Sequence, residues 1–184
     1  LFLPLFSLND SIYIAFPLKD FTLKWYAQMF ANEPMFAALM NSFRVGVATS
    51  VLATFLGIFA AKAVTRYRMP GRAPVVSFIM LPLVIPGIIV ASSMLVLFIS
   101  IGLKPSLTAV ILGHSFLALP FSVSIMKSAF DDFDASLEEA AYDLGSTVLE
   151  TFRRVTLPVV APGIVSSFLV TFTVSFDEFV LAFF

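Results

Sequence analysis

Cysteine is absent from this 184-residue sequence, and histidine occurs only once, at position 114. Without cysteine, these residues can form no disulfide bond, thiolate metal site or cysteine nucleophile. The single His114 provides no histidine cluster for a metal ion, and we expect it to make a hydrogen bond between packed helices. The phosphate-binding pattern G-x-x-x-x-G-K-[ST] is missing, and no motif links the histidine to a serine and an acid. We therefore expect no metal site, no ATP site and no catalytic residue on this chain.

Charge is scarce as well, because charged residues make up 12% of the sequence and the formal net charge is −1. A near-neutral chain without a basic patch or an acidic tail gives no sign of nucleic-acid binding. Hydrophobic residues make up 59%, and the mean hydropathy is +0.99. They gather in runs of about twenty residues or more and lack the alternation of barrel strands. The composition predicts an all-α, polytopic transmembrane helical bundle in a lipid membrane.

The two ends of the sequence suggest a piece of a longer polypeptide. It begins at Leu1 rather than at a methionine, and it stops within an apolar segment. We therefore interpret residues 1–184 as a single transmembrane domain that is truncated at both ends. The opening letters "LFLPLF" read as the last turns of a cut membrane helix, and residues 7–41 place aromatic side chains beside lysines, which suits a headgroup interface.

Four apolar runs divide the rest of the sequence. They cover approximately residues 43–63, residues 73–103, residues 107–126 and the segment from Val159 onward. The first run carries small residues that permit close helix packing, namely Gly46, Ala48, Ser50, Ala53 and Gly57. In the second run, Pro82, Pro86 and Gly87 should kink or break the helix near its middle. The prolines at 82, 86 and 120 are candidate hinges of a transport path, although proline is also ordinary in membrane helices.

The positions of lysine and arginine predict the topology. The connection after the first run carries four cations and no acid, namely Lys62, Arg66, Arg68 and Arg72. By the positive-inside rule, this connection is cytoplasmic. Counting crossings from it puts residues 7–41 and Lys104 outside and the polar stretch 127–158 in the cytoplasm. Ten of the chain's charged residues lie in that last stretch, so it is the most polar part of an apolar chain.

Two helix starts can be recognised inside the polar stretch. Ser136 with Glu139, and Thr147 with Glu150, each follow the capping-box pattern, in which side chains satisfy the amides of a first helical turn. Gly145 lies between them and can adopt the left-handed conformation that ends the first helix. The pattern predicts a short helix, a bend enforced by glycine and a second short helix.

The second short helix should give way to the next membrane run at Pro158. Residues 131–158, here called the knuckle, are thus expected to form a cytoplasmic helix-turn-helix loop. Ala140 and Ala141 would present a small surface on it. A solvated connector is the commonest role of such a loop, but this one is shaped to dock into a partner.

One set of knuckle residues follows a spaced motif, namely Glu139, Ala140, Ala141, Gly145, Val155, Leu157 and Pro158. Three residues separate the EAA triplet from the glycine, and nine separate the glycine from Val155. This pattern resembles the EAA loop of ABC importer permeases, with Val155 in place of the usual isoleucine. The resemblance implies an ABC importer permease fold and an ATPase-coupling role for these seven residues in a groove of the ATPase subunit.

Four further segments narrow the resemblance. They read "SLNDS", "FTLKWY", "RYRMPG" and "SFDEFVLAFF", and they are similar to the PotC-type permeases of spermidine/putrescine importers. This resemblance implies a multi-pass permease of a bacterial inner membrane. Its expected partners are two copies of an ABC ATPase, a second permease subunit forming a heterodimer, and a periplasmic substrate-binding protein. ATP and magnesium would bind to the ATPase, so no cofactor is expected on this chain.

Two acids interrupt the last apolar run. Asp177 and Glu178 lie between Phe176 and Phe179, and a carboxylate at the bilayer centre costs about 2.5 to 3.5 kcal/mol. A lipid-facing pair is therefore unfavourable. The four residues either line an aqueous substrate path, where they would attract an organic cation, or mark the outer end of a completed span. The polyamine resemblance favours the path.

Other functions remain open from the residues alone. Within ABC importers, the cargo is alternatively another small solute, such as ferric iron or an opine-like compound. A proton-coupled secondary transporter using Asp177 and Glu178 would work without an ATPase, but it leaves the knuckle unexplained. A membrane anchor that recruits a partner would tolerate neutralising both acids, whereas a cation path would not.

Overall fold

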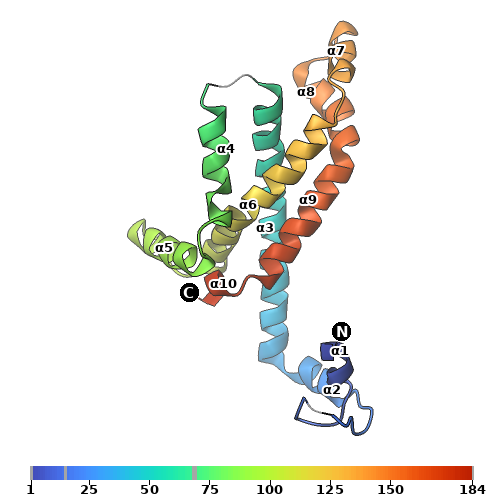
Figure 1. Ribbon diagram of the computed structural model, residues 1–184, viewed down its shortest axis with the longest axis vertical. Helices are drawn as coiled ribbons and strands as arrows, with labels where there is room; N and C mark the ends of the chain where they lie inside the picture. Colours follow the sequence, from blue (N-terminus) through green and yellow to red (C-terminus); the bar gives the residue numbers. More distant parts are fainter. Residues whose placement is uncertain (1, 15, 68–69, 184) are drawn as a thin grey trace. The chain divides into compact units, whose positions relative to one another are not determined.

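The computed structural model describes residues 2–14, 16–67 and 70–183, and Figure 1 shows them as helices joined by short connections. Within these ranges there is no β-strand, only an isolated antiparallel bridge between Asn9 and Phe21. The prediction of an all-α fold is thus confirmed. The helices fall into two compact units, one ending at Ser42 and one beginning at Phe43.

The first unit is organised around a buried asparagine. It contains α1 (Phe2–Ser7), α2 (Lys24–Ala31) and the beginning of α3 (Glu33–Arg66). The indole Nε1 of Trp25 donates to the carbonyl oxygen of Asn9 at 2.9 Å, and the backbone N–H of Lys19 donates to the Asn9 side chain at 2.8 Å. These bonds hold Lys19 and Trp25 against Asn9, an arrangement that the interfacial composition of the segment did not predict.

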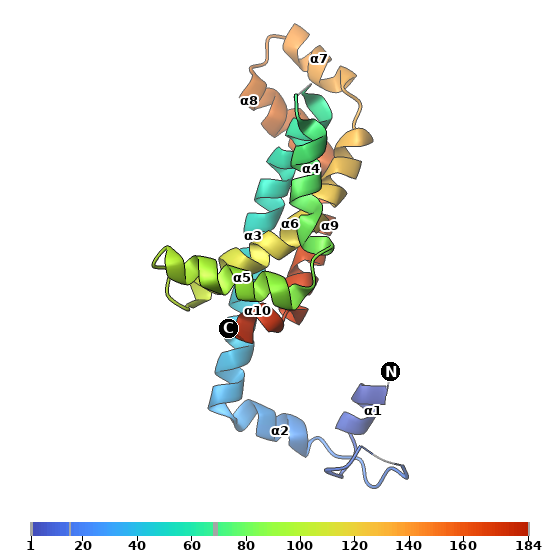
Figure 2. The same cartoon turned by 60° about the vertical axis from the view of Figure 1, so that its left-hand side comes forward.

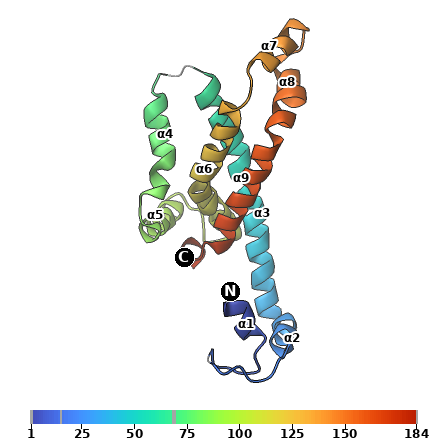
Figure 3. The ribbon, with the colours of Figure 1, turned by 45° about the vertical axis from the view of Figure 1, so that its right-hand side comes forward.

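The second unit contains the remaining helices. In chain order these are α4 (Arg72–Met80), the 3-10 turn η1 (Leu81–Leu83), α5 (Gly87–Ser100), α6 (Leu107–Asp131), α7 (Ser136–Asp143), α8 (Val148–Thr151), the π-helical turn η2 (Phe152–Thr156), α9 (Leu157–Asp177) and α10 (Val180–Phe183). The second part of α3, α6 and α9 pack together as a three-helix bundle (Figures 1 and 3). The end of α3, the start of α4, α7 and α8 lie at one end of this bundle, and α5 and α10 lie at the other (Figure 2).

Among the described residues, three helices are long and apolar enough to cross a membrane, judged by length and composition. They are α3, α6 and the continuous helix Val148–Asp177, and the bent pair of α4 with η1 and α5 would make a fourth span. The four expected apolar runs therefore correspond to helices. Lys62, Arg66 and Arg72 lie at the same end as the knuckle, as the topology prediction requires, while Arg68 lies outside the described residues.

The second span is broken between Leu83 and Gly87, as the prolines at 82 and 86 led us to predict. The two halves of this span, Arg72–Leu83 and Gly87–Ser100, meet at an angle of 105°. Pro86 takes an extended ψ of 131°, so the chain leaves the helical conformation there and α5 starts afresh at Gly87. By contrast, Pro120 lies inside α6 without ending it.

Small residues bring the three bundle helices close together. A Cβ atom added at Gly57 of α3 would lie 1.9 Å from the Ser122 hydroxyl of α6. Ser122 also bonds the Ser167 hydroxyl of α9 at 2.8 Å, and Ser167 bonds Thr54 of α3 at 3.2 Å. These side chains are buried, so each hydroxyl finds its partner on another helix rather than in solvent. The predicted close packing of the first apolar run is confirmed at Gly57.

Candidate functional site

The knuckle stands at one end of the three-helix bundle, where α7 and α8 follow one another around a bend (Figures 1 and 2). The bend centres on Gly145, whose φ of +85° lies in the left-handed region that glycine adopts without strain. The N–H of Ser146 donates to the carbonyl of Ala141 at 3.0 Å, and the N–H of Gly145 donates to that of Tyr142 at 2.8 Å. This pair of bonds is a Schellman motif, so the predicted glycine stop of the first helix is confirmed.

Only one of the two predicted capping boxes is formed. Thr147 accepts from the N–H of Glu150, and the Glu150 carboxylate accepts from the N–H of Thr147. The N–H of Thr147 holds the pKa of Glu150 below its usual range. The box at Ser136 is wrong, because Ser136 already lies inside α7 and makes no side-chain cap with Glu139. Instead, the Asp134 carboxylate accepts from the N–H of Ser136 at 2.9 Å, which lowers the pKa of Asp134.

The prediction that the second helix ends at Pro158 is also wrong. The chain stays helical from Val148 to Asp177, passing through the π-helical turn Phe152–Thr156. In that turn, the N–H of Leu157 donates to the carbonyl of Phe152. Pro158 is the second residue of α9 and follows this turn directly. The wider turn thus lets the knuckle continue directly into a membrane span.

The residues of the spaced motif do not form one surface. Ala141 is buried, and Val155 packs against the buried cluster of Ile58, Ala61, Met126, Phe130, Phe133 and Val160. Leu157 is half-buried. Glu139, Ala140, Gly145 and Pro158 are exposed. The motif therefore combines positions that fix the knuckle onto the bundle with positions that a partner can reach.

Five large apolar side chains of the knuckle are exposed. Leu144 is 88% exposed, Leu149 is 75% exposed and Val148 is 65% exposed, while Leu137 and Tyr142 are exposed to a lesser degree. Exposed apolar side chains clustered on one short loop are typical of a protein interaction site. We call these five residues the apolar face. The spaced motif contains none of them, but Leu137, Tyr142 and Leu144 lie between the two predicted caps, which was a signal available in the sequence.

A partly buried ion pair joins the base of the knuckle to α3. The Lys62 ammonium lies 3.0 Å from Glu138 Oε1, and the two side chains are 14% and 12% exposed. The Thr156 hydroxyl donates to the same carboxylate oxygen. Burial raises the pKa of Glu138, but the hydrogen bonds from Thr156 and Lys62 outweigh it and hold the pKa below the usual value. Sequence reasoning missed Glu138, since its lysine partner is 76 residues away in the chain.

The four predicted path residues lie at the other end of α9. Asp177 is the last residue of that helix and is exposed, as are Phe176 and Phe179. Glu178 is half-buried and leaves the helical conformation, and its carboxylate accepts from the N–H of Leu181 at 3.1 Å. Phe176 also stacks on Phe172. The structure therefore brings these residues together at a helix end, with Glu178 engaged as a cap of α10.

His114 makes the helix-packing hydrogen bond that we expected of it. Its Nδ1 lies 2.9 Å from the Ser175 hydroxyl, which links α6 to α9. The side chain is buried, and no group of three or more histidine and acidic side chains among the described residues is placed to hold a metal ion.

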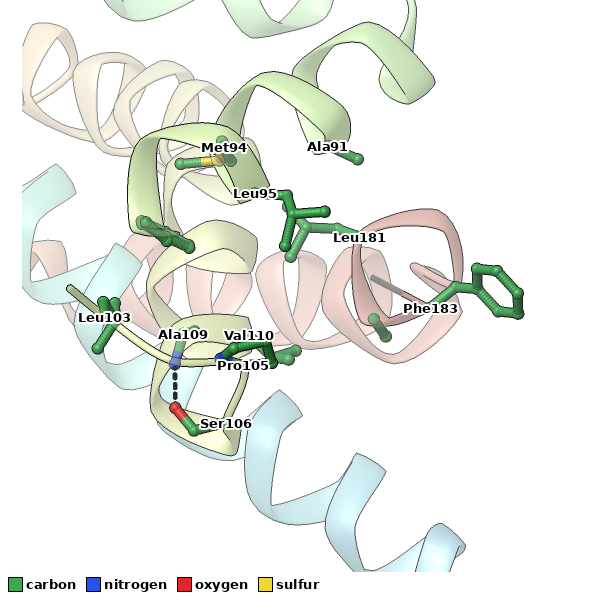
Figure 4. Close-up of a pocket in the computed structure, with 12 residues that line it drawn as sticks. Ala91, Met94, Leu95, Leu103, Pro105, Ser106, Ala109, Val110, Leu181 and Phe183 are labelled. Atoms are coloured by element: carbon green, nitrogen blue, oxygen red, sulfur yellow. Dashed lines mark hydrogen bonds between the residues drawn. The ribbon is translucent and has the colours of Figure 1, made fainter. Parts of the chain in front are cut away.

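A cavity of about 210 Å³ lies beside the path residues, between α5, α6 and α10. Figure 4 shows Met94 and Leu95 of α5 facing Leu181 of α10 across it. Its walls are apolar except for Ser106, whose hydroxyl accepts from the N–H of Ala109 at 3.3 Å. None of the four path residues contributes a side chain to the wall, so the cavity presents no carboxylate to a cation.

The fold is shared with a solved transporter. The structure of the MetNI methionine ABC transporter in inward-facing conformations covers 78% of this chain with a TM-score of 0.63, at 21% sequence identity and over 73% of its own chain. At that level of identity the similarity concerns the fold alone. It agrees with the expected permease-type helical bundle.

Sequence comparisons identify related permeases. The spermidine/putrescine transport system permease protein PotC of Haemophilus influenzae is 32% identical over 89% of this chain and 64% of its own length. The putrescine transport system permease protein PotI of Escherichia coli is 30% identical over 99% of this chain and 67% of its own length. The chain thus spans slightly less than two thirds of the PotC relative.

Another relative is named for a different class of solute. The trehalose transport system permease protein SugB of Mycobacterium tuberculosis is 31% identical over 85% of this chain and 57% of its own length. Residues 53–184 match the family described as the binding-protein-dependent transport system inner membrane component. This match covers the bundle and the whole knuckle, and the chain therefore belongs to that family of inner-membrane transport proteins.

Proposed function

We propose that this chain is the membrane-spanning permease subunit of an ATP-binding-cassette importer for spermidine and putrescine. The observation that carries the proposal is the knuckle, a capped and exposed helix pair joined directly to a membrane span. The names of the PotC and PotI relatives support the cargo. A periplasmic binding protein would deliver that cargo, and a second permease subunit would complete the path.

The knuckle is proposed to dock into the ATPase subunit on the cytoplasmic side. Its apolar face would be buried in the ATPase groove, since large exposed leucines gain most when they lose contact with water. Glu139, Ala140 and Gly145 are exposed beside it and would permit a close approach. ATP and magnesium would bind to the ATPase, so this chain would contribute movement rather than chemistry.

The movement would enter the membrane through α9. Because helix Val148–Asp177 is continuous, a displacement of α8 by the ATPase would be passed along one helix to the opposite end of the bundle. The path residues Phe176, Asp177 and Glu178 lie at that opposite end. Closure of the ATPase pair would in this way switch the path between inward-open and outward-open states.

The acids at the end of α9 are proposed to receive the cation. Asp177 is exposed, and the exposed rings of Phe176 and Phe179 flank the acid pair. An ammonium group would gain both charge pairing and cation–π attraction there. Glu178 is engaged with the N–H of Leu181, so Asp177 is the acid better placed to bind.

The test is uptake of labelled spermidine into proteoliposomes that contain the full-length protein with its second permease, ATPase and binding protein. The proposal expects uptake that requires ATP and falls sharply in Asp177→Asn, with ATPase activity retained. Lys104→Gln is a matched control, since it changes a charge at the same end outside the path residues. ATP hydrolysis without spermidine uptake would remove the polyamine and favour another small solute, and uptake without the ATPase would favour a proton-coupled transporter.

A further inference from the structure

Three separate elements meet at the Glu138 carboxylate. Lys62 reaches it from α3, Thr156 reaches it from the π-helical turn, and Glu138 itself belongs to α7. One carboxylate oxygen accepts from both partners. A single side chain therefore joins the start of the knuckle, its end and the neighbouring membrane helix.

This ion pair is less exposed to solvent than a surface pair. Its two side chains are 14% and 12% exposed, whereas those of the Lys127 and Asp131 pair within α6 are 39% and 48% exposed. A surface pair is weakened by water and salt and contributes little. Breaking a buried pair is costly, because the remaining charge is left without a partner in a poorly solvated site.

Two cation–π contacts reinforce the same junction. The Lys62 ammonium lies 4.6 Å from the ring centre of Phe152 in the π-helical turn. One turn further along α3, the Arg66 guanidinium lies 5.0 Å from the ring of Phe133, and its Nη2 donates to the Phe133 carbonyl at 2.8 Å. Phe133 precedes α7 and Phe152 follows α8, so α3 contacts both connections between the knuckle and the bundle.

We propose that Glu138 is the positioning residue that makes the knuckle and α3 move as one body when the ATPase displaces the knuckle. This inference rests on the proposed function. The inference gives different roles to two adjacent glutamates, because Glu138 pairs with Lys62 of α3 while Glu139 is exposed. Without the junction, α7 would be connected to the bundle only through residues 132–135 and the π-helical turn. A push on the apolar face would then rotate the knuckle instead of moving α3.

The consequence is a specific kind of defect. Loss of the Glu138 carboxylate leaves the apolar face in place, so the ATPase still docks and still hydrolyses ATP. What falls is the amount of solute transported for each ATP hydrolysed. A residue needed only for folding would instead lower the amount of assembled complex.

The experiment compares Glu138→Gln, Lys62→Gln, the double variant and the control Lys127→Gln in the full-length complex. We expect each single variant to lower uptake per ATP by about tenfold, a typical coupling within one polar network. The double variant should lose less than the product of the two single losses, since both changes remove the same ion pair. Losses that multiply in the double variant, or an equal loss in Lys127→Gln, would overturn the proposal.

A second measurement reports the junction without using transport. Because the sequence contains no cysteine, spin labels can be attached at Leu56→Cys on α3 and Asp143→Cys on α7, which are both exposed. The distance distribution should be narrow in the parent complex and broad in Glu138→Gln. An equally narrow distribution in Glu138→Gln would overturn the junction. If the parent complex shows no ATP-dependent uptake, the proposed function fails, and the label distances still decide whether Glu138 joins the two helices.

Discussion

The bundle and the knuckle both depend on glycine, but for opposite reasons. At Gly57, a Cβ atom would lie 1.9 Å from the Ser122 hydroxyl, while the backbone there is ordinary helix. At Gly145, a Cβ atom would meet nothing within 4 Å, while the φ of +85° excludes most other residues. The bundle is therefore fixed by contact between side chains, and the knuckle is fixed by backbone geometry.

This difference explains how one chain can have a closely packed bundle and a knuckle with exposed apolar side chains. In the bundle, small residues bring α3 close to α6 at Gly57, and hydroxyl groups link α6 to α9. The shape of the knuckle depends on a Schellman motif, a capping box and one partly buried ion pair. None of these requires its large apolar side chains, so the apolar face stays exposed for binding.

The largest expected effect is overpacking of the bundle. Gly57→Ala should lower the free energy of unfolding in detergent by about 3 kcal/mol, the upper end for a change that forces packed atoms apart. The added methyl group cannot be accommodated without moving α6, because the hydroxyl and the Cβ of Ser122 both lie within 2.8 Å of its position. Thermal unfolding of the purified protein measures the change.

A compensating substitution sharpens this prediction. Ser122→Gly removes the atoms nearest to the new methyl group, so Gly57→Ala with Ser122→Gly should recover part of the loss. Recovery stays partial, since the Ser167 hydroxyl loses a hydrogen-bond partner. A double variant less stable than Gly57→Ala alone would contradict this account of the contact.

The next effect concerns binding rather than stability. Leu144→Asp places a charge at the most exposed leucine of the apolar face and should weaken association with the ATPase at least about tenfold, or about 1.4 kcal/mol. Its thermal stability should hardly change, since the side chain makes few contacts in this chain. Ile12→Asp is the matched control, at 84% exposure in the first unit, which the topology prediction puts outside. Equal loss of ATPase binding in both variants would argue against a specific site on the knuckle.

A smaller effect is expected at the bend itself. Gly145→Ala places a methyl group in open space but forces alanine into the left-handed region, at a cost of about 1 kcal/mol. Gly145→Asn should cost less, because asparagine tolerates this conformation better. Hydrogen exchange of the α7 amides measures the local loss. Equal protection in the alanine variant and the parent protein would show that the bend does not depend on φ.

The smallest effect is a pH dependence of the junction at Glu138. Its pKa in the folded protein lies below the usual 4.5, so its ionised form stabilises the fold above that value. The contribution is lost as the pH falls through the lowered pKa, when the carboxylate takes up a proton next to Lys62 and Arg66. Between pH 6 and the acid range, the parent protein should therefore lose more stability than Glu138→Gln. Asp134 and Glu150 titrate in both proteins, so an identical decline would contradict the role of Glu138.

Much of this architecture was predictable from local sequence. The apolar runs, the break at Pro82 and Pro86, the turn at Gly145 and the cap at Thr147 each depend on residues within a few positions of one another. Two local predictions, the cap at Ser136 and the helix end at Pro158, were wrong. At the first position, the N–H of Ser136 bonds to the carboxylate of the nearby Asp134. At the second position, a π-helical turn that no sequence pattern predicts precedes Pro158, and the chain stays helical.

The contacts that join distant segments were not predictable. Lys62 is one of several cations in a basic connection, and Glu138 is an acid next to the spaced motif. Nothing in the local sequence indicates that they pair. The same holds for Ser122 with Ser167 and for the bonds of Lys19 and Trp25 to Asn9. Such pairs follow from how the helices pack in three dimensions. The motif residues found from the sequence thus describe the knuckle, while the junction that anchors it required the structure.

The most direct test of the central claim is a crosslink from the apolar face. A single cysteine at Leu144, in a protein that has no other in residues 1–184, can carry a short photoactivated crosslinker in the full-length complex. The account predicts that Leu144→Cys crosslinks to the ATPase subunit, with a yield that changes when ATP is added, while Ile12→Cys does not. An active, assembled complex in which Leu144→Cys fails to reach the ATPase would contradict the claim that the knuckle is the docking element.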